Sequence, residues 1–557
     1  MPTIVQHLQE LLPDGTNPGA GGSLGKCPAW PPDLFAVAAA VLASSSYYAT
    51  PPFTAGWDKL AYIFTDTYVA EVRRIAEKWA QTGTVPSPLQ KLWRDFTRNG
   101  DAEFRPALLA IVIRLLAIAD AASLGVGFAP ATPDASSKPT VFPTIVLEAL
   151  LGLAARKRPV LPYVPSSLCI MVPNTKACVQ PKTNTPLVGC TLRSLSHNLA
   201  FLPPINVVAT SWLFMHPAEE SRGPFNILLV PYPYVVNAND FEAVVERADE
   251  QQGFFTYRGG WRDRNDKLAN PVKIADAICA LISSARRETE KIHGVALPEC
   301  ALTSSQAARV AAILARKNPD LELFVSGTVT SQKGSSRPRN CAYTARLYRG
   351  TILDHWSQSK HHRWSLEARQ IGQYHLGSIL DPNRTWWEKI DVSNRTCVFT
   401  VVRWGASLTV LVCEDLARFE PVLPIINAVG PNLVIALLMD GPQLERRWPG
   451  RYATVLADDP GSAVLTLTSL GMIRRSSMPG AGDQRQIALW KQAGGTACEL
   501  SLPVGDHALL LSLTSSPYPQ KTMDRRDDDG ATRRFVLSGA RGVRFDKDKI
   551  PKWLRLD

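Results

Sequence analysis

The stretch Val410-Leu411-Val412-Cys413-Glu414-Asp415 places a cysteine and two carboxylates directly after a run of aliphatic residues. Because the run is apolar on both faces, it predicts a strand buried in the middle of a sheet. A cysteine at the end of such a strand can sit in a sharp turn, with its sulfur in a cleft and a backbone N–H beside it for an oxyanion. Buried cysteines usually behave as small apolar side chains, so this stretch alone does not indicate catalysis.

Two other segments supply groups that complement the cysteine. Glu299 follows the apolar run Val295-Ala296-Leu297, and Lys360 follows a predicted β-hairpin that turns at Arg349-Gly350. Alone, each is an ordinary surface charge at a strand end. Together with Cys413 they provide a carboxylate, an ammonium and a thiol at three strand ends, a complete set of groups for cleaving a carbon–nitrogen bond.

The ordered set of Pro298-Glu299, Lys360 and Cys413 resembles the nitrilase, or carbon–nitrogen hydrolase, superfamily. The sequence Cys-Glu-Asp-Leu at 413–416 is similar to the glutaminase domain of glutamine-dependent NAD synthetases, and Asn340 before the hairpin also fits the family pattern. The resemblance covers roughly residues 224–514. It implies an α/β fold, a four-layer αββα sandwich in which two sheets face each other.

The resemblance also implies a role for each residue of the set. Cys413 is the expected nucleophile and Glu299 the base that takes its proton and later serves the leaving amine and the hydrolytic water. Lys360 is expected to hold the thiolate and stabilise the oxyanion, with the backbone N–H of Glu414 as a second donor. The expected intermediate is a thioester on Cys413.

Other candidate site residues flank this set. Many family members carry a second glutamate after the lysine, and Glu367 is the nearest candidate. The NAD-synthetase-like glutaminases have a Glu-x-Arg at this place with a longer gap from the lysine, so this chain departs from that pattern. His361, His362 and Trp386 are the candidate substrate-binding residues, with a structural role as the alternative for each.

The pattern of elements along the 557 residues predicts several domains. Residues 1–160 are expected to form an all-helical accessory domain, with a Pro/Ser/Ala linker at 129–138 and a last helix at 143–156. Residues 161–222 are a Pro/Ser/Thr-rich bridging segment. Strands and helices alternate over 223–520, which predicts the α/β domain. Residues 521–557 are expected to be a basic C-terminal tail.

Composition and charge argue against several classes of protein. The net charge of +11 is spread without the aromatic and basic pattern of a nucleic-acid module, so nucleic-acid binding is not expected. Ten scattered cysteines without a C-x-x-C pair suit a reducing cytoplasm, and neither a metal nor another cofactor is expected. The apolar stretch 106–128 contains Arg114 and Asp120, which favours a buried helix over a membrane span. No signal peptide is evident at the N-terminus.

Two functions remain open at this point. The first is a cysteine-dependent hydrolase that cleaves a non-peptide carbon–nitrogen bond in a small molecule, with an amide favoured over a nitrile. The second is a non-enzymatic or regulatory nitrilase-like module that binds a small metabolite, as part of a bacterial defence system for example. The presence of all three family residues favours the enzyme, since a binding module without catalysis could lose any of them. A homo-oligomer is the expected assembly, because two-fold pairing is common for this architecture.

Overall fold

The computed structural model describes most of the chain, with gaps that fall mainly in the N-terminal third. The described residues are 4–12, 26–45, 48, 64–98, 106–126, 141–142, 167–186, 189, 191–202, 204, 209–213, 223–244, 251–330, 338–476, 483–530, 532–547 and 550–556. The predicted linker at 129–138 and the predicted helix at 143–156 lie outside these residues, apart from residues 141–142 just before that helix.

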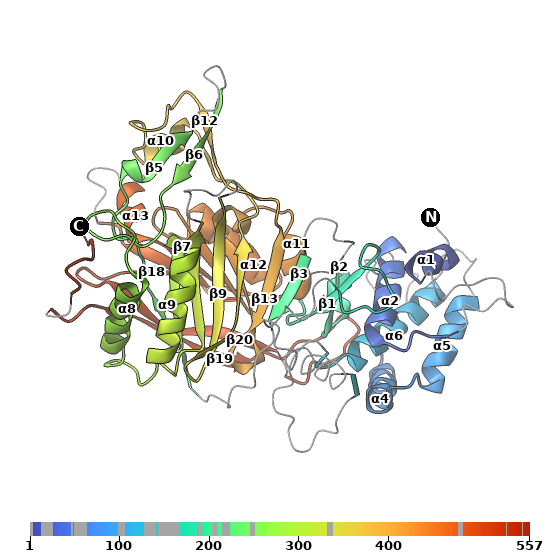
Figure 1. Ribbon diagram of the computed structural model, residues 1–557. Coiled ribbons are helices and arrows are strands. Elements are labelled where there is room, and N and C mark those ends of the chain that lie inside the picture. Colours follow the sequence, from blue (N-terminus) through green and yellow to red (C-terminus); the bar gives the residue numbers. More distant parts are fainter. Residues whose placement is uncertain are drawn as a thin grey trace.

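Two seven-stranded sheets form the centre of the molecule (Figure 1). The strands of the first sheet are, in spatial order, β10 (Thr351–Ser359), β9 (Asn340–Tyr348), β8 (Leu323–Val329), β7 (Gly294–Thr303), β4 (Phe225–Leu229), β19 (Ala508–Pro517) and β20 (Arg533–Val543). Those of the second are β18 (Cys498–Ser501), β17 (Gln486–Lys491), β16 (Ala463–Thr468), β15 (Leu433–Leu438), β14 (Ser407–Val412), β13 (Thr396–Val401) and β3 (Ala209–Leu213).

The two sheets pack against each other, and helices lie on their outer sides. Strand β7 contacts β15 and β16, and β9 contacts β14. Helices α8 (Pro271–Ala285) and α9 (Ser304–Lys317) pack together on the first sheet, while α12 (Trp448–Asp458) and α13 (Leu470–Ser476) contact the second. Because β14 and β15 are covered on both faces, every residue in them is buried, as the apolar run at 410–412 predicts for β14.

A smaller four-stranded sheet projects above the two large sheets in Figure 1. It consists of β11 (Ser365–Leu366), β12 (Thr385–Glu388), β6 (Gln252–Tyr257) and β5 (Phe241–Val244), and α10 (Ala368–Gln373) follows β11. An apolar cluster of its own, including Phe241, Phe255, Trp364 and Trp386, holds it together. This small sheet matters for the site because β12 ends in Glu388.

The described N-terminal residues before 127 form helices joined by short connections. Its helices are α1 (Ile4–Leu11), α2 (Pro31–Ser45), α4 (Asp66–Thr82), α5 (Ser87–Arg98) and α6 (Pro106–Ala122), and the strand pair β1 (Cys178–Pro181) and β2 (Leu199–Leu202) follows. Thr65 caps the start of α4, and Gly83 at φ 67° ends it. No described helix combines the length and the apolar character that crossing a membrane requires.

The C-terminal residues differ from the predicted tail. Strand β20 pairs with β19 at the edge of the first sheet, so much of the segment after residue 520 belongs to that sheet. An edge strand that is only partly buried keeps basic and small residues, and its sequence therefore resembles a solvated tail.

Candidate active site

Glu299 enters the site through a distortion of β7. Between the pairs Leu297–Ser326 and Leu302–Thr328, four residues of β7 lie opposite the single residue Gly327 of β8. The bulge includes Cys300 at φ 58°, a left-handed conformation that is uncommon for a side chain other than glycine. Glu299 therefore leaves the strand alternation, and its side chain is buried.

Lys360 joins two buried carboxylates. Its Nζ lies 3.0 Å from Glu299 Oε1 and 2.7 Å from Glu388 Oε2. The Asn340 side-chain amide donates to the same two carboxylates, at 2.7 Å to Glu299 Oε1 and 2.8 Å to Glu388 Oε1. These bonds fix one oxygen of Glu299, while its Oε2 is buried with no hydrogen-bond partner among the described residues. That oxygen is free to accept a proton.

Cys413 lies directly after β14, at the turn that the sequence predicted. Its φ of 46° is again left-handed, so the chain turns sharply at the sulfur-bearing residue. The thiol is buried and takes a backbone hydrogen bond from Met439, just past the neighbouring strand β15. The Glu414 carboxylate is turned away and pairs with Arg418 at 2.9 Å, which leaves only the backbone of Glu414 for an oxyanion role.

Burial and the charges of neighbouring groups shift the pKa values of Cys413, Glu299 and Lys360. Burial raises the pKa of the Cys413 thiol well above its usual value, the charge of Glu299 raises it further, and Lys360 opposes both. Burial also raises the pKa of Glu299, with Lys360 again opposing and Glu388 adding to the shift. Burial acts to lower the pKa of Lys360, but Glu299, Glu388 and Cys413 outweigh it and hold that pKa well above its usual range. Lys360 is therefore a permanent cation among groups whose anionic forms compete for it.

Asp415 connects the Cys413 turn to the segment after Lys360. Its carboxylate accepts the backbone N–H of His361 at 3.0 Å and of His362 at 3.1 Å, and His362 Nδ1 lies 3.0 Å away. The two functional segments are thus fixed relative to each other by one buried side chain. His361 Nε2 lies 3.2 Å from the carbonyl oxygen of Thr396, and burial lowers the pKa of this imidazole although Asp415 opposes the shift.

The structure thus brings Glu299, Lys360 and Cys413 into one buried cluster but leaves other candidates outside it. Glu367 is exposed at the start of α10, and the second glutamate on Lys360 is Glu388. Trp386 is buried in the small sheet, with its indole N–H donating to the carbonyl of Asp381 at 2.9 Å. Of the two histidines, His361 is fully buried and His362 is partly exposed. Within the described ranges, no group of three or more His, Cys, Asp or Glu side chains is arranged to hold a metal ion.

Comparisons with known proteins gave matches among solved structures only: no protein-family model and no curated protein matches the chain. Nit3 of Saccharomyces cerevisiae, a member of branch 10 of the nitrilase superfamily, is 12% identical, with 51% of this chain and 84% of that chain covered and a TM-score of 0.27. A carbon–nitrogen hydrolase from Helicobacter pylori G27 is 13% identical, with 47% and 85% covered and a TM-score of 0.28.

A glutamine-dependent NAD(+) synthetase from Cytophaga hutchinsonii is 13% identical, with 52% of this chain and 42% of that chain covered and a TM-score of 0.26. These neighbours come from the superfamily that the sequence motifs resemble. At TM-scores this low we base no inference about activity on them.

Proposed function

We propose that this protein is a cysteine-dependent hydrolase of a non-peptide carbon–nitrogen bond, acting on a small-molecule amide. The observation that carries the proposal is the buried Glu299–Lys360 pair, whose charges both act on the Cys413 thiol. One oxygen of Glu299 has no hydrogen-bond partner in the part of the chain that the structure describes. A thiol, a proton acceptor and a fixed cation at one point are the groups that acyl transfer from nitrogen requires. The order helix, sheet, sheet, helix supports a four-layer αββα arrangement around them.

In the first half of the proposed reaction, Glu299 takes the thiol proton and the Cys413 sulfur bonds to the amide carbonyl carbon. The ammonium of Lys360, with the backbone N–H of Glu414, stabilises the negative charge that develops on the carbonyl oxygen. The carbon–nitrogen bond then breaks, and Glu299 returns its proton to the leaving ammonia or amine. The acyl group remains on sulfur as a thioester.

In the second half, water replaces the amine. Glu299 takes a proton from the water as its oxygen attacks the thioester carbonyl, and the carbon–sulfur bond breaks. The carboxylic acid leaves and the proton returns to the Cys413 sulfur. Glu388 binds the Lys360 ammonium, and the Asn340 amide binds both Glu299 and Glu388. Glu388 and Asn340 therefore keep Glu299 and Lys360 in place during both halves of the reaction.

A screen of small-molecule amides for ammonia release tests the proposal. For any amide turned over, Cys413→Ala should abolish turnover, and Glu299→Gln should slow it on the order of 10²–10⁴-fold through loss of the base. Cys498→Ala is the matched control, since this cysteine is exposed and remote in sequence from the cluster. Full activity of the Cys413→Ala protein would overturn the mechanism. Mass spectrometry should detect the acyl adduct on Cys413 and on no other cysteine.

A further inference from the structure

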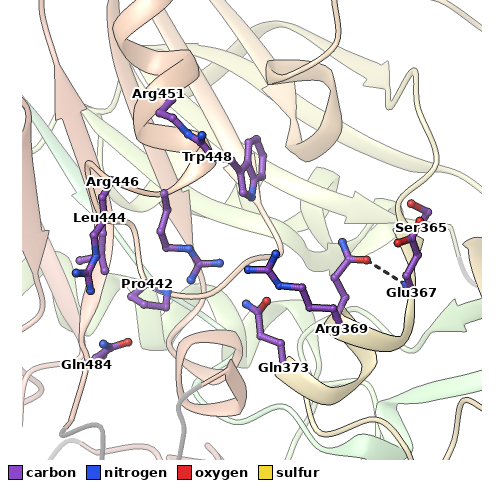
Figure 2. Close-up of a pocket in the computed structure, with 12 residues that line it drawn as sticks. Ser365, Glu367, Arg369, Gln373, Pro442, Leu444, Arg446, Trp448, Arg451 and Gln484 are labelled. Carbon is purple, nitrogen blue, oxygen red and sulfur yellow. Dashed lines mark hydrogen bonds between the residues drawn. The ribbon is translucent and has the colours of Figure 1, made fainter. Parts of the chain in front are cut away.

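An arginine-rich cavity of about 710 Å³ is lined by residues of α10, of the start of α12 and of the segment just before α12. Four arginines line it: Arg369, Arg446, Arg447 and Arg451. In Figure 2, Arg369 and Gln373 extend from α10 toward the wall that carries Pro442, Trp448 and Arg451. The volume falls within the usual range for small-molecule sites of about 300–1,000 Å³.

The charge of this cavity is largely uncompensated. Arg447 pairs with Asp440 at 2.7 Å, but Arg369, Arg446 and Arg451 have no carboxylate within ion-pair distance in the part of the chain that the structure describes. Glu367 is the one carboxylate among the described lining residues. Counting Glu367 against the three unpaired arginines leaves a net charge of about +2 facing the space, which suits a ligand with at least two negative charges.

The chemistry of the lining points to phosphate rather than to a single carboxylate. Guanidinium groups offer paired donors that match phosphate oxygens, and several of them converge here. The positive end of the α12 helix dipole adds to this, since Trp448 and Arg451 belong to its first turn. The side chains of Trp448 and Gln373 provide a ring face and an amide for the uncharged part of a ligand.

A short chain of contacts links the cavity to Cys413. The lining residue Arg447 holds Asp440, which also accepts the Tyr374 hydroxyl at 2.6 Å. Asp440 follows Met439, whose backbone bonds the Cys413 sulfur. Burial raises the pKa of Tyr374, and Tyr374 is also close enough to Cys413 for the thiolate charge to add to this shift, so Asp440 and Tyr374 connect a wall residue of the cavity to the nucleophile.

We propose that this arginine cavity binds a phosphate-bearing small molecule and holds the charged end of the amide substrate whose carbonyl reaches Cys413. The assignment of the ligand as substrate rests on the proposed function. The anion site itself does not, because it depends only on the arginines.

Inorganic pyrophosphate is a suitable probe, and its binding to the full chain is measured by isothermal titration calorimetry. The variant Arg369→Gln/Arg446→Gln should weaken pyrophosphate binding at least about tenfold through the loss of two charge-assisted contacts. Arg287→Gln/Arg541→Gln removes the same charge from two exposed ion pairs elsewhere and should leave binding unchanged. Acetate, a monoanion, should bind far more weakly than pyrophosphate.

A second measurement tests the link to the nucleophile. Pyrophosphate should slow alkylation of Cys413 by iodoacetamide, followed by mass spectrometry, and the double variant Arg369→Gln/Arg446→Gln should lose this protection. Equal weakening of binding by both double variants, or no binding at all, would overturn the anion site. Binding without protection of Cys413 would overturn its assignment to the substrate. Pyrophosphate binding to Cys413→Ala is expected to persist, so a failure of the amidase proposal would leave this result intact.

Discussion

Lys360 forms ion pairs with two buried carboxylates, Glu299 and Glu388, so the charge of one carboxylate affects the proton affinity of the other. The charge of Glu388 contributes to the raised pKa of Glu299. In Glu388→Gln, Lys360 pairs with Glu299 alone, and the Glu299 pKa should fall, which makes it a weaker base. We expect kcat/KM to drop about 10- to 100-fold, as for other residues that position a reacting group.

The pH profile separates this effect from a general structural defect. The acid limb of kcat/KM should move to lower pH in Glu388→Gln, because Glu299 loses its proton more readily. Glu242→Gln, an exposed position in β5 of the same small sheet, should change neither the rate nor the profile. An acid limb that stays in place would show that Glu388 does not tune Glu299.

The raised pKa of Glu299 also predicts how stability depends on pH. A carboxyl whose pKa is higher in the folded than in the unfolded state favours folding below its unfolded value, near 4.5. That contribution is lost as the pH rises through the folded pKa, because the unfolded chain releases the proton first. Glu299→Gln has no such proton, so its urea midpoint relative to the natural protein should rise between pH 4.5 and neutral pH. A constant difference across this range would contradict the raised pKa.

The residues of the site differ in how far the sequence could predict them. Glu299, Lys360 and Cys413 each follow a strong local signal, an apolar strand or a hairpin, and the structure brings these three together. Glu388 has no such signal, because it ends a short strand of a separate sheet and follows Lys360 only after an intervening helix. The longer gap of the glutaminase pattern is a signal that favours a later glutamate, whereas closeness in sequence to Lys360 favours Glu367.

At the scale of elements, the β7 bulge depends on the glycine that faces it. A Cβ at Gly327 would lie 2.5 Å from the carbonyl oxygen of Pro298 and closer still to the Glu299 backbone. In Gly327→Ala the bulge must move, and Glu299 with it. We expect a loss of about 1–3 kcal/mol in the free energy of unfolding, as for other overpacked sites, together with loss of most activity.

Gly539→Ala provides the control for this prediction. Gly539 also lies in a strand of the same sheet, and a Cβ there meets nothing within 4 Å. Its activity should match that of the natural protein. Denaturant unfolding and the amide assay on both variants decide the matter, and an active Gly327→Ala protein would show that the bulge tolerates displacement.

Pairing between distant segments explains which elements the sequence did not predict. Strand β15 is a continuous apolar run, so the residues within it are enough to indicate a buried strand. Strand β12 instead pairs in parallel with β6, more than a hundred residues earlier, and β20 is a half-exposed edge. Neither has the periodicity of a buried element, because tertiary pairing rather than local pattern stabilises it.

At the scale of the whole molecule, a buried ion network joins the N-terminal helices to the C-terminal segment. Asp120 of α6 accepts Arg526 Nη1 at 2.7 Å and the backbone N–H of Asn198 at 2.8 Å. Arg526 also pairs with Asp524, which accepts the Tyr68 hydroxyl of α4 at 2.8 Å. Segments from four parts of the chain therefore meet at one guanidinium group.

Removal of the Asp120 carboxylate should weaken the contact of α6 with β2 and with the C-terminal segment around Arg526. In Asp120→Ala, Arg526 and backbone N–H groups near β2 lose a buried partner, which should cost about 3–5 kcal/mol in the free energy of unfolding. Burial acts to raise the Asp120 pKa, but Arg526 and the surrounding donors lower it. Its contribution should therefore persist above an unfolded pKa of about 3.9 and be lost only as the pH falls through the lower folded value.

Hydrogen exchange followed by mass spectrometry locates the effect. Exchange should rise in α6, β2 and residues 522–526 of Asp120→Ala, while β7 and β14 keep their protection because the inter-sheet core does not contain Asp120. Arg73→Ala, which breaks only the exposed pair with Asp529, should leave exchange nearly unchanged. A uniform rise over the whole chain would instead mean that the helices and the sheets unfold as one cooperative unit, and the network would then be part of a single core.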